Sequence, residues 1–511
     1  MALLGYQIVI SLIMASIIQK VGKHYSFAKW MLCNTGLVRY LYPTDSALRQ
    51  LAGVPKEINK KKKDKRHHEN GHISSSQVFH VPRNLDFELE SSKVEILDVI
   101  HLRFFQDYQM LLDFSVYSLM VYVLTEIFSY FMPLRDEINL SMVWCLLVVL
   151  FSTYPFKIHF TTFSSLNVAS RKILLSLTVQ YFSGEESIGE RSTVIVTFFS
   201  YLLLAMAILL INEDNLETGL DLAYKSFNQS ANTFLERHGL NSEGPASKLI
   251  LKFSIAVWCA VIGALFTFPG LRVARMHWDS IKACSDSKFL GLFLNLNFAA
   301  PFFLTLLWLR PVAKHYLTVR VFNNMQVPIM TENAFDALRI VLIVAVVLLR
   351  VALMPFYLQA YLNIAKRRIE EQKREAGRIT NKELQKKIAA VFYYMCVVAL
   401  QYVAPILLCL YFALMYKTLG EYSWSNLFDT QGIVSDDEEC PAGSKPLIPL
   451  GEDDSVLRSA QEITLAIGSL KQVLTRDVAR GLFGFATWWT CFAWFASSAL
   501  GLVYQSYFTQ V

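Results

Sequence analysis

The side chains in this sequence that could do chemistry are ionisable residues inside long apolar segments. Arg350 interrupts the run IVLIVAVVLLRVALM, and Arg339 lies eleven residues before it. A helix advancing 100° per residue places both arginines on one face. A charge at the centre of a membrane costs about 2.5–3.5 kcal/mol on insertion scales, so each arginine needs a partner or an aqueous cavity. These two residues are therefore the first candidates for a functional site.

An earlier apolar segment, residues 108–132, supplies the opposite charge through Asp113 and Glu126. Thirteen residues separate these two acids, a helical rotation of about 220°, so one interface cannot use both. We expect at most one of them to pair with Arg350, in an ion pair that is either structural or functional.

Two further segments carry a polar amide four residues before a proline: Asn297 before Pro301, and Gln401 before Pro405. Proline removes the hydrogen bond that the carbonyl four residues earlier would accept. Freed carbonyls of this kind coordinate cations in some transporters, whereas in other membrane helices neighbouring side chains satisfy them. Pro355 is a third predicted kink.

The elements that must position these residues are membrane spans. The chain has 511 residues, of which 54% are hydrophobic and 18% charged, and its mean hydropathy is +0.35. Runs of roughly 17–25 apolar residues can cross a bilayer. We predict an all-α, polytopic membrane protein with about nine spans, at residues 2–19, 108–132, 141–182, 192–212, 249–269, 289–309, 337–361, 388–415 and 481–508.

Positive charges near span ends predict the orientation. The connections after the first, fifth and seventh spans are basic, whereas residues 418–479 are acidic. This places the N-terminus outside and the C-terminus in the cytosol. The predicted units are an anchor (1–19), a basic cytosolic loop (20–107), a helical core (108–415), an acidic non-cytosolic loop (416–480) and a last span with a short C-terminus (481–511).

The first and third spans are the least regular. The first lacks the basic start and the A-x-A-like cleavage site of a signal peptide, which favours an uncleaved anchor. The third begins as SMVWCLLVVLF, and resumes as RKILLSLTVQYF after a less apolar stretch.

The loops carry signals of their own. Asn228 and Asn139 lie in N-x-S motifs, so we predict glycosylation on the non-cytosolic side. The basic, helix-compatible segment 362–387 is expected near the cytosolic headgroups, in contact with anionic lipid. The lysine and histidine run at 60–68 is typical of a solvated tail, and we expect no nucleic-acid partner.

No pattern in the sequence indicates catalysis, a cofactor or a metal. The eight cysteines show no CxxC pair, which argues against a disulfide framework or a zinc site. A lipid-modifying enzyme would need a nucleophile and a base at one membrane depth, but neither G-x-S-x-G nor H-x-x-x-x-D occurs. Nine histidines are predicted to lie outside the spans, namely His24, His67, His68, His72, His80, His101, His238, His277 and His315.

Several long stretches make the chain similar to the transmembrane protein 161 family, of which the animal A and B types are the closest in pattern. These stretches include MASIIQKVGKHYSFAKWMLCN (14–34), FTFPGLR (266–272), FDALR (335–339), LQAYLN (358–363) and VFYYMCVVALQYVAP (391–405). Against the family pattern, residues 153–169 resemble an insertion within one continuous span.

The resemblance implies a non-enzymatic membrane protein of the plasma membrane or endoplasmic reticulum. It implies regulation of calcium and potassium handling, cell excitability and heart rhythm, with channel or pump subunits as partners. Two alternatives stay open. One is a channel or transporter in its own right that uses the intramembrane polar residues, and the other is a membrane factor in oxidative or DNA-damage stress tolerance.

Overall fold

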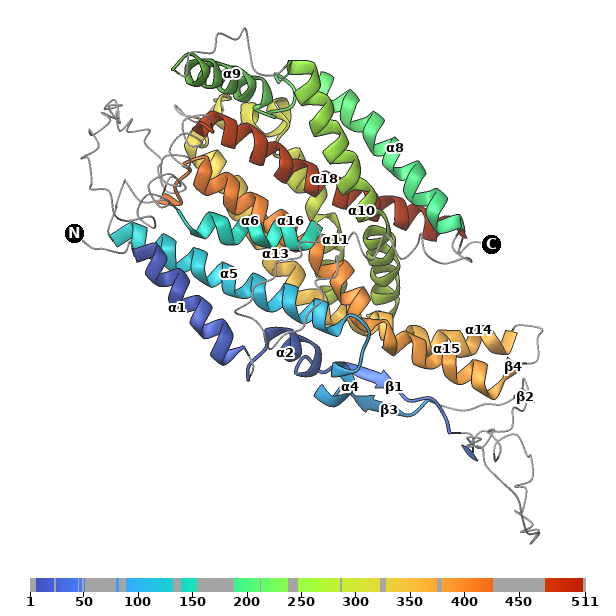
Figure 1. Cartoon of the computed structure of the whole chain (residues 1–511). Coiled ribbons are helices and arrows are strands. Elements are labelled where there is room, and N and C mark those ends of the chain that lie inside the picture. Colours follow the sequence, from blue (N-terminus) through green and yellow to red (C-terminus); the bar gives the residue numbers. More distant parts are fainter. Residues whose placement is uncertain are drawn as a thin grey trace, which may run out of the picture.

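The computed structural model is an α-helical bundle with two short antiparallel strand pairs (Figure 1). The described residues are 6–22, 24–44, 46–47, 50, 80–81, 89–131, 139–153, 188–211, 213–237, 247–284, 287–321, 328–374, 379–425 and 474–508. The predicted all-α class is confirmed.

Within the described ranges, six helices are long and apolar enough to cross a membrane, and they correspond to predicted spans two and four to eight. They contain α5 (Phe105–Phe131), α8 (Ile188–Leu210), α10 (Lys248–Ala283), α11 (Lys288–Leu306), α13 (Glu332–Leu362) and α16 (Met395–Leu419). The first and third predicted spans correspond to the shorter apolar helices α1 (Tyr6–Val21) and α6 (Ser141–Thr153). Residues 171–182, the predicted second half of span three, lie outside the described ranges.

The last predicted span corresponds to α18 (Arg476–Phe508), whose 33 residues extend for about 50 Å. Three buried tryptophans, Trp488, Trp489 and Trp494, lie in this helix. α18 packs extensively against both α10 and α16, so it lies inside the bundle rather than at its edge. A total of nine spans and their orientation stay predictions.

α16 forms the centre of the core. Every residue from Met395 to Lys417 is buried, because the helix is hydrophobic on all sides. Tyr411 Oη donates to the Ser115 carbonyl of α5 at 2.5 Å, and Tyr122 Oη lies 3.1 Å from Thr418 Oγ1. Aromatic hydroxyls therefore join the central helix to α5.

α8, α10 and α18 approach one another closely through small residues. A side chain at Gly263 would meet the ring of Tyr201 in α8, and one at Gly501 would lie 2.8 Å from Ala274 Cβ. Small residues let apolar helices pack backbone to backbone in a membrane, where van der Waals contact drives association.

The basic segment at 362–387 is not one helix but two. α14 (Ile364–Arg374) follows α13 after a turn at Asn363, and α15 (Asn381–Tyr393) leads into α16. Thr380 and Glu383 form a capping box at the N-terminus of α15. A new helix therefore begins here, and the predicted single helix is divided. The two helices form a hairpin with an apolar core of its own, made of Ile364, Ala365, Ile369, Leu384, Ile388 and Val391.

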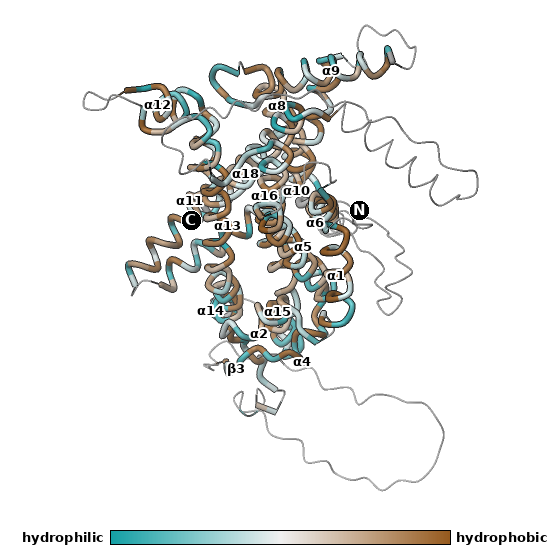
Figure 2. The backbone as a smooth tube through the Cα atoms, turned by 90° about the vertical axis from the view of Figure 1, so that its left-hand side faces the viewer, coloured by the Kyte–Doolittle hydropathy of each residue, from teal (hydrophilic) through white to brown (hydrophobic). Residues whose placement is uncertain are grey.

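The strand pairs, the shortest helices and the more polar helices lie at the two ends of the bundle. One end holds α2 (Phe27–Cys33), α4 (Ile96–Ile100), the pair β1 (Val38–Tyr40) and β3 (Ser91–Lys93), and the pair β2 (His80–Val81) and β4 (Ile379–Thr380), together with the α14–α15 hairpin (Figure 1). The other end holds α9 (Leu220–Arg237) and α12 (His315–Thr318), as Figure 2 shows. Hydrophobic residues dominate along α1 and α5 between these ends (Figure 2).

This arrangement puts the described parts of the basic connections at one end of the bundle, as the predicted alternation of loop charge requires. Residues 426–473, which make up most of the predicted acidic loop 416–480, lie outside the described residues. The proposed division into units at 19, 107, 415 and 480 stays a prediction.

The close packing of α10 on α18 predicts an effect of Gly270→Ala on stability. The added methyl group would lie 2.7 Å from the Ser497 carbonyl carbon, so the helices must separate. We expect a loss of about 1–3 kcal/mol, seen as a lower melting temperature of the purified chain in detergent.

Gly291→Ala is the matched control, because its methyl group would meet nothing within 4 Å. In a helix this change is neutral or stabilising, by about 0.5–1 kcal/mol. Equal melting temperatures for the two variants would contradict the packing described for α10 and α18.

Candidate functional site

α13 carries three buried polar side chains along one face. Arg339 and Arg350 are each 1% exposed, and Tyr357, seven residues after Arg350, is fully buried. Steps of eleven and seven residues complete five helical turns, so all three lie in one row. The predicted shared face of the two arginines is confirmed.

The guanidinium of Arg350 binds the backbone carbonyl of Asn297 on α11, at 2.9 Å from Nη2. Pro301 leaves this carbonyl without its helical donor. The ring of Trp494 lies 4.0 Å from Arg350 Cζ and adds a cation–π contact. The carbonyl that the sequence marks as a possible cation ligand is therefore occupied by a cation of the protein itself.

The sequence allowed at most one acid of α5 to pair with Arg350, and neither acid does. Asp113 instead accepts hydrogen bonds from Ser26 Oγ at 2.6 Å and from the Ala28 amide at 2.9 Å, at the start of α2. Glu126 lies 2.5 Å from Lys417 Nζ on α16. Both acids satisfy donors nearer to their own ends of α5, and among the described residues no carboxylate pairs with Arg350.

A row of polar contacts extends from Arg350 to α10. Asn297 Nδ2 donates to Tyr357 Oη at 3.2 Å, and His277 Nδ1 lies 3.1 Å from the same hydroxyl. The His277 ring also stacks on Phe298, with 4.4 Å between centroids. His277 is thus buried in the bundle rather than outside a span, because α10 continues as a helix to Ala283.

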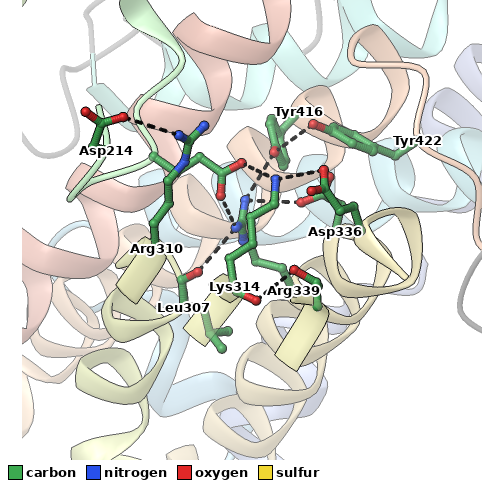
Figure 3. A network of polar contacts seen from close by, with 11 residues as sticks. Asp214, Leu307, Arg310, Lys314, Asp336, Arg339, Tyr416 and Tyr422 are labelled. Atoms are coloured by element: carbon green, nitrogen blue, oxygen red, sulfur yellow. Dashed lines mark hydrogen bonds and ion pairs between the residues drawn. The ribbon is translucent and has the colours of Figure 1, made fainter. Parts of the chain in front are cut away.

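Arg339 is held by charged groups near the opposite end of α13. Its Nη2 lies 2.8 Å from Glu217 Oε2 and donates to the Leu307 carbonyl at 3.2 Å. Its Nη1 lies 3.5 Å from Asp336 Oδ1. Figure 3 shows Leu307, Asp336 and Arg339 close together, with Lys314 beside them. The guanidinium also lies over the ring of Trp308, with 4.5 Å from Arg339 Cζ to the ring centroid.

Lys314 completes this ion network. It lies in the π-helical turn η2 (Arg310–Lys314), and its Nζ is 2.9 Å from Glu217 Oε1 and 3.4 Å from Glu332. Glu217 therefore bridges two cations from different segments, and the network joins residues 213–219, η2 and α13.

Electrostatics keeps this network charged. Burial raises the pKa of the Glu217 carboxyl, but Arg339 and Lys314 outweigh burial and hold that pKa below its ordinary value. Burial lowers the pKa of Lys314, and its contact with Glu217 raises the pKa above the ordinary value. Both groups are therefore ionised across neutral pH.

Glu217, Lys314 and Asp336 were missed by the sequence analysis, because two of them lie in connections between helices. A usable signal was present, since Arg339 lies close to the start of an apolar helix, where a nearby loop can supply an acid.

The remaining predicted residues lie within α13 and α16. Gln401 is 2% exposed inside α16, and its Oε1 has no hydrogen-bond partner. Pro355 and Pro405 lie within α13 and α16.

The two glycosylation motifs differ in their surroundings. Asn228 is half-buried on α9. Asn139 accepts from the Ser141 amide at 3.2 Å and from Ser141 Oγ at 2.5 Å. Glycosylation of either residue stays a prediction.

The arrangement satisfies the backbone carbonyl that Pro301 leaves free in α11, and it fixes the two positive charges of Arg339 and Arg350 inside the bundle. No group of three or more His, Cys, Asp or Glu residues able to hold a metal ion occurs among the described residues. The centre around Arg350 contains a cation without an acid, and the centre around Arg339 contains a nearly balanced ion network.

Arg339→Met is predicted to destabilise the chain by about 3 kcal/mol, because Glu217 and Asp336 lose a buried cation. Arg476→Met is the control, since Arg476 pairs with Glu421 at 3.2 Å while both side chains are about half exposed. Such a pair contributes about 0–1 kcal/mol. If thermal unfolding shows that Arg476→Met loses as much stability as Arg339→Met, or more, the assigned role of Arg339 is contradicted.

The pH dependence gives a second readout for Glu217. Its pKa is lowered on folding, so its stabilisation is complete above the unfolded value of about 4.3 and is lost as the pH falls through the folded value. The difference in melting temperature between wild type and Glu217→Gln should be large at neutral pH and shrink below about pH 4. A difference that stays constant with pH would contradict the ion network.

Arg350 and Pro301 are predicted to be energetically coupled. Pro301→Ala supplies a backbone amide that can donate to the Asn297 carbonyl. When Arg350 is present, this amide competes with the guanidinium for the carbonyl. In the Arg350→Met variant, the amide instead satisfies a carbonyl that has no other donor. The double-variant cycle should therefore show a coupling of about 1 kcal/mol or more, with Pro301→Ala better tolerated when Arg350 is absent. Additive effects would exclude the proposed bond.

Comparison with known proteins defines the family. The model of the family described as predicted transmembrane protein 161AB matches residues 2–509. No solved structure matches the chain. The apolar helices and this match together identify an integral membrane protein. Because the match covers nearly the whole length, the chain belongs to the transmembrane protein 161 family.

Proposed function

We propose that this protein is a non-enzymatic, multi-pass membrane protein that regulates calcium and potassium handling and thereby cell excitability. In this proposal it acts on channel or pump subunits rather than conducting ions itself. The observation that carries the choice is the bond between Arg350 and the Asn297 carbonyl. A cation that bound at the Pro301 kink would need that carbonyl, and a fixed guanidinium both occupies it and repels other cations.

The packing of the bundle supports the same choice. α16, at the centre, is buried along its whole length, and tryptophan and tyrosine side chains fill its contacts with α18 and α5. A core packed in this way keeps the bundle in a fixed shape. A regulatory subunit needs such a shape to present a constant surface to the protein that it regulates.

One observation favours the alternative of a channel or transporter. Arg350 has no acidic partner among the described residues, and Asn297 Oδ1 and Gln401 Oε1 are buried without hydrogen-bond partners. Unmatched polar groups inside a membrane protein often line an ion or water path.

The two functions are separated by measuring currents and flux with the same protein. Whole-cell calcium or potassium currents should change when the chain is deleted and recover when the wild type is restored. The purified chain in liposomes should give no flux for a panel of cations. Unchanged currents would contradict the regulatory proposal, and flux abolished by Arg350→Met would establish the alternative.

The expected partners can be identified from the cytosolic end. Proximity labelling from the α14–α15 hairpin should recover channel or pump subunits. A labelled set without such subunits would count against regulation by direct contact.

A further inference from the structure

The connection between α11 and α13 turns apolar side chains away from the bundle. η2 and α12 form one helical segment from Arg310 to Thr318, here called the η2–α12 segment, and Val319 caps its end. Val312, Tyr316 and Val319 are 56%, 42% and 55% exposed. They follow one another at steps of four and three residues, about one helical turn each, so they share one face. This face is called the outer face below.

The opposite face of the η2–α12 segment is held to the bundle by polar contacts. Lys314 Nζ reaches Glu217 Oε1 at 2.9 Å, and the buried Thr318 hydroxyl donates to the Lys314 carbonyl at 2.8 Å. The Leu317 carbonyl accepts a hydrogen bond from the Met330 amide at 3.2 Å. A surface helix in water packs apolar groups inward and charged groups outward. Here an ammonium group points inward and two valines point outward.

The outer face adjoins the lipid-facing side of a membrane span. α11 is apolar enough to cross a membrane, and its exposed side includes Leu296 and Phe303, which lie seven residues apart on one face. Val312 follows Phe303 by only nine residues. Figure 2 shows α12 to one side of the bundle, at the end that carries α9. The exposed apolar surface of α11 thus leads directly into the outer face.

The polar groups of the outer face are those that suit a membrane boundary. The guanidinium of Arg320 lies over the ring of Tyr316, with 5.3 Å from Cζ to the ring centroid. Tyrosine is enriched where acyl chains meet headgroups, because its ring is apolar and its hydroxyl is polar. Arginine buries its stem along apolar surface and keeps its charge at the headgroup level.

We propose that the η2–α12 segment lies in the membrane interface, with its outer face in the leaflet at this end of the bundle. Val312 and Val319 contact acyl chains, and Tyr316 and Arg320 lie among the headgroups. A lipid leaflet suits this face better than a protein partner, because the segment joins two membrane-crossing helices, α11 and α13, that both end beside it. Since Lys314 lies on the other face, the leaflet also fixes the depth of the ion network around Glu217.

The test is the accessibility of a spin label on the purified full chain in lipid nanodiscs. The label is attached at Val312→Cys or, separately, at Val319→Cys, in a chain whose Cys33, Cys284 and Cys440 are replaced by serine. The five other native cysteines are buried, and the same chain without an added cysteine gives the blank. Each label should collide severalfold more often with oxygen, which dissolves among acyl chains, than with a water-soluble nickel chelate.

Two reference positions set the scale. Asp214→Cys reports water at the same end of the bundle, because the Asp214 side chain is 92% exposed beside Arg310. Leu296→Cys reports the acyl interior, because Leu296 is exposed near the middle of α11. The oxygen-to-nickel ratio at Val312→Cys and Val319→Cys should lie between those of the two references. A ratio equal to that of Asp214→Cys would show a face left in water for a protein partner. That result, or low access for both reagents, would overturn the proposal, as would a ratio equal to that of Leu296→Cys.

Discussion

The structure depends on a single constraint, namely that a guanidinium inside a membrane-spanning bundle must be satisfied by what surrounds it. Arg350 is fully buried, and the protein provides a carbonyl and an aromatic ring rather than a carboxylate. The carbonyl is available only because Pro301 breaks the hydrogen-bond pattern of α11. Arg350 thus satisfies the carbonyl that Pro301 leaves free, and the same carbonyl satisfies the buried guanidinium. This bond fixes α11 against α13.

Arg339 meets the same constraint by different means, because it lies nearer the polar end of the bundle. There the connections between helices can supply acids, and Glu217 pairs with both Arg339 and Lys314. One face of α13 therefore carries Arg339 in an ion network with acidic partners, and Arg350 without an acidic partner among the described residues.

The sequence predicted what local periodicity controls. Long apolar runs gave the helices, the eleven-residue spacing placed Arg339 and Arg350 together, and the proline rule identified the Asn297 carbonyl as an available acceptor. The sequence could not predict which side chains pair across the bundle. Asp113 caps α2 and Glu126 meets Lys417, because helix tilt and register decide which charges face each other. The division of the basic segment into two helices depended on the capping box at Thr380, which the sequence also contains.

The central claim is that the Arg350 guanidinium occupies the Asn297 carbonyl, so that this carbonyl is not open to a free cation. An experimental structure of the full chain in a lipid nanodisc tests it most directly. Electron cryomicroscopy should show the guanidinium within hydrogen-bond distance of that carbonyl and stacked on Trp494. Density that places the Arg350 side chain against a carboxylate, or turned away with another ion at the carbonyl, would contradict the account.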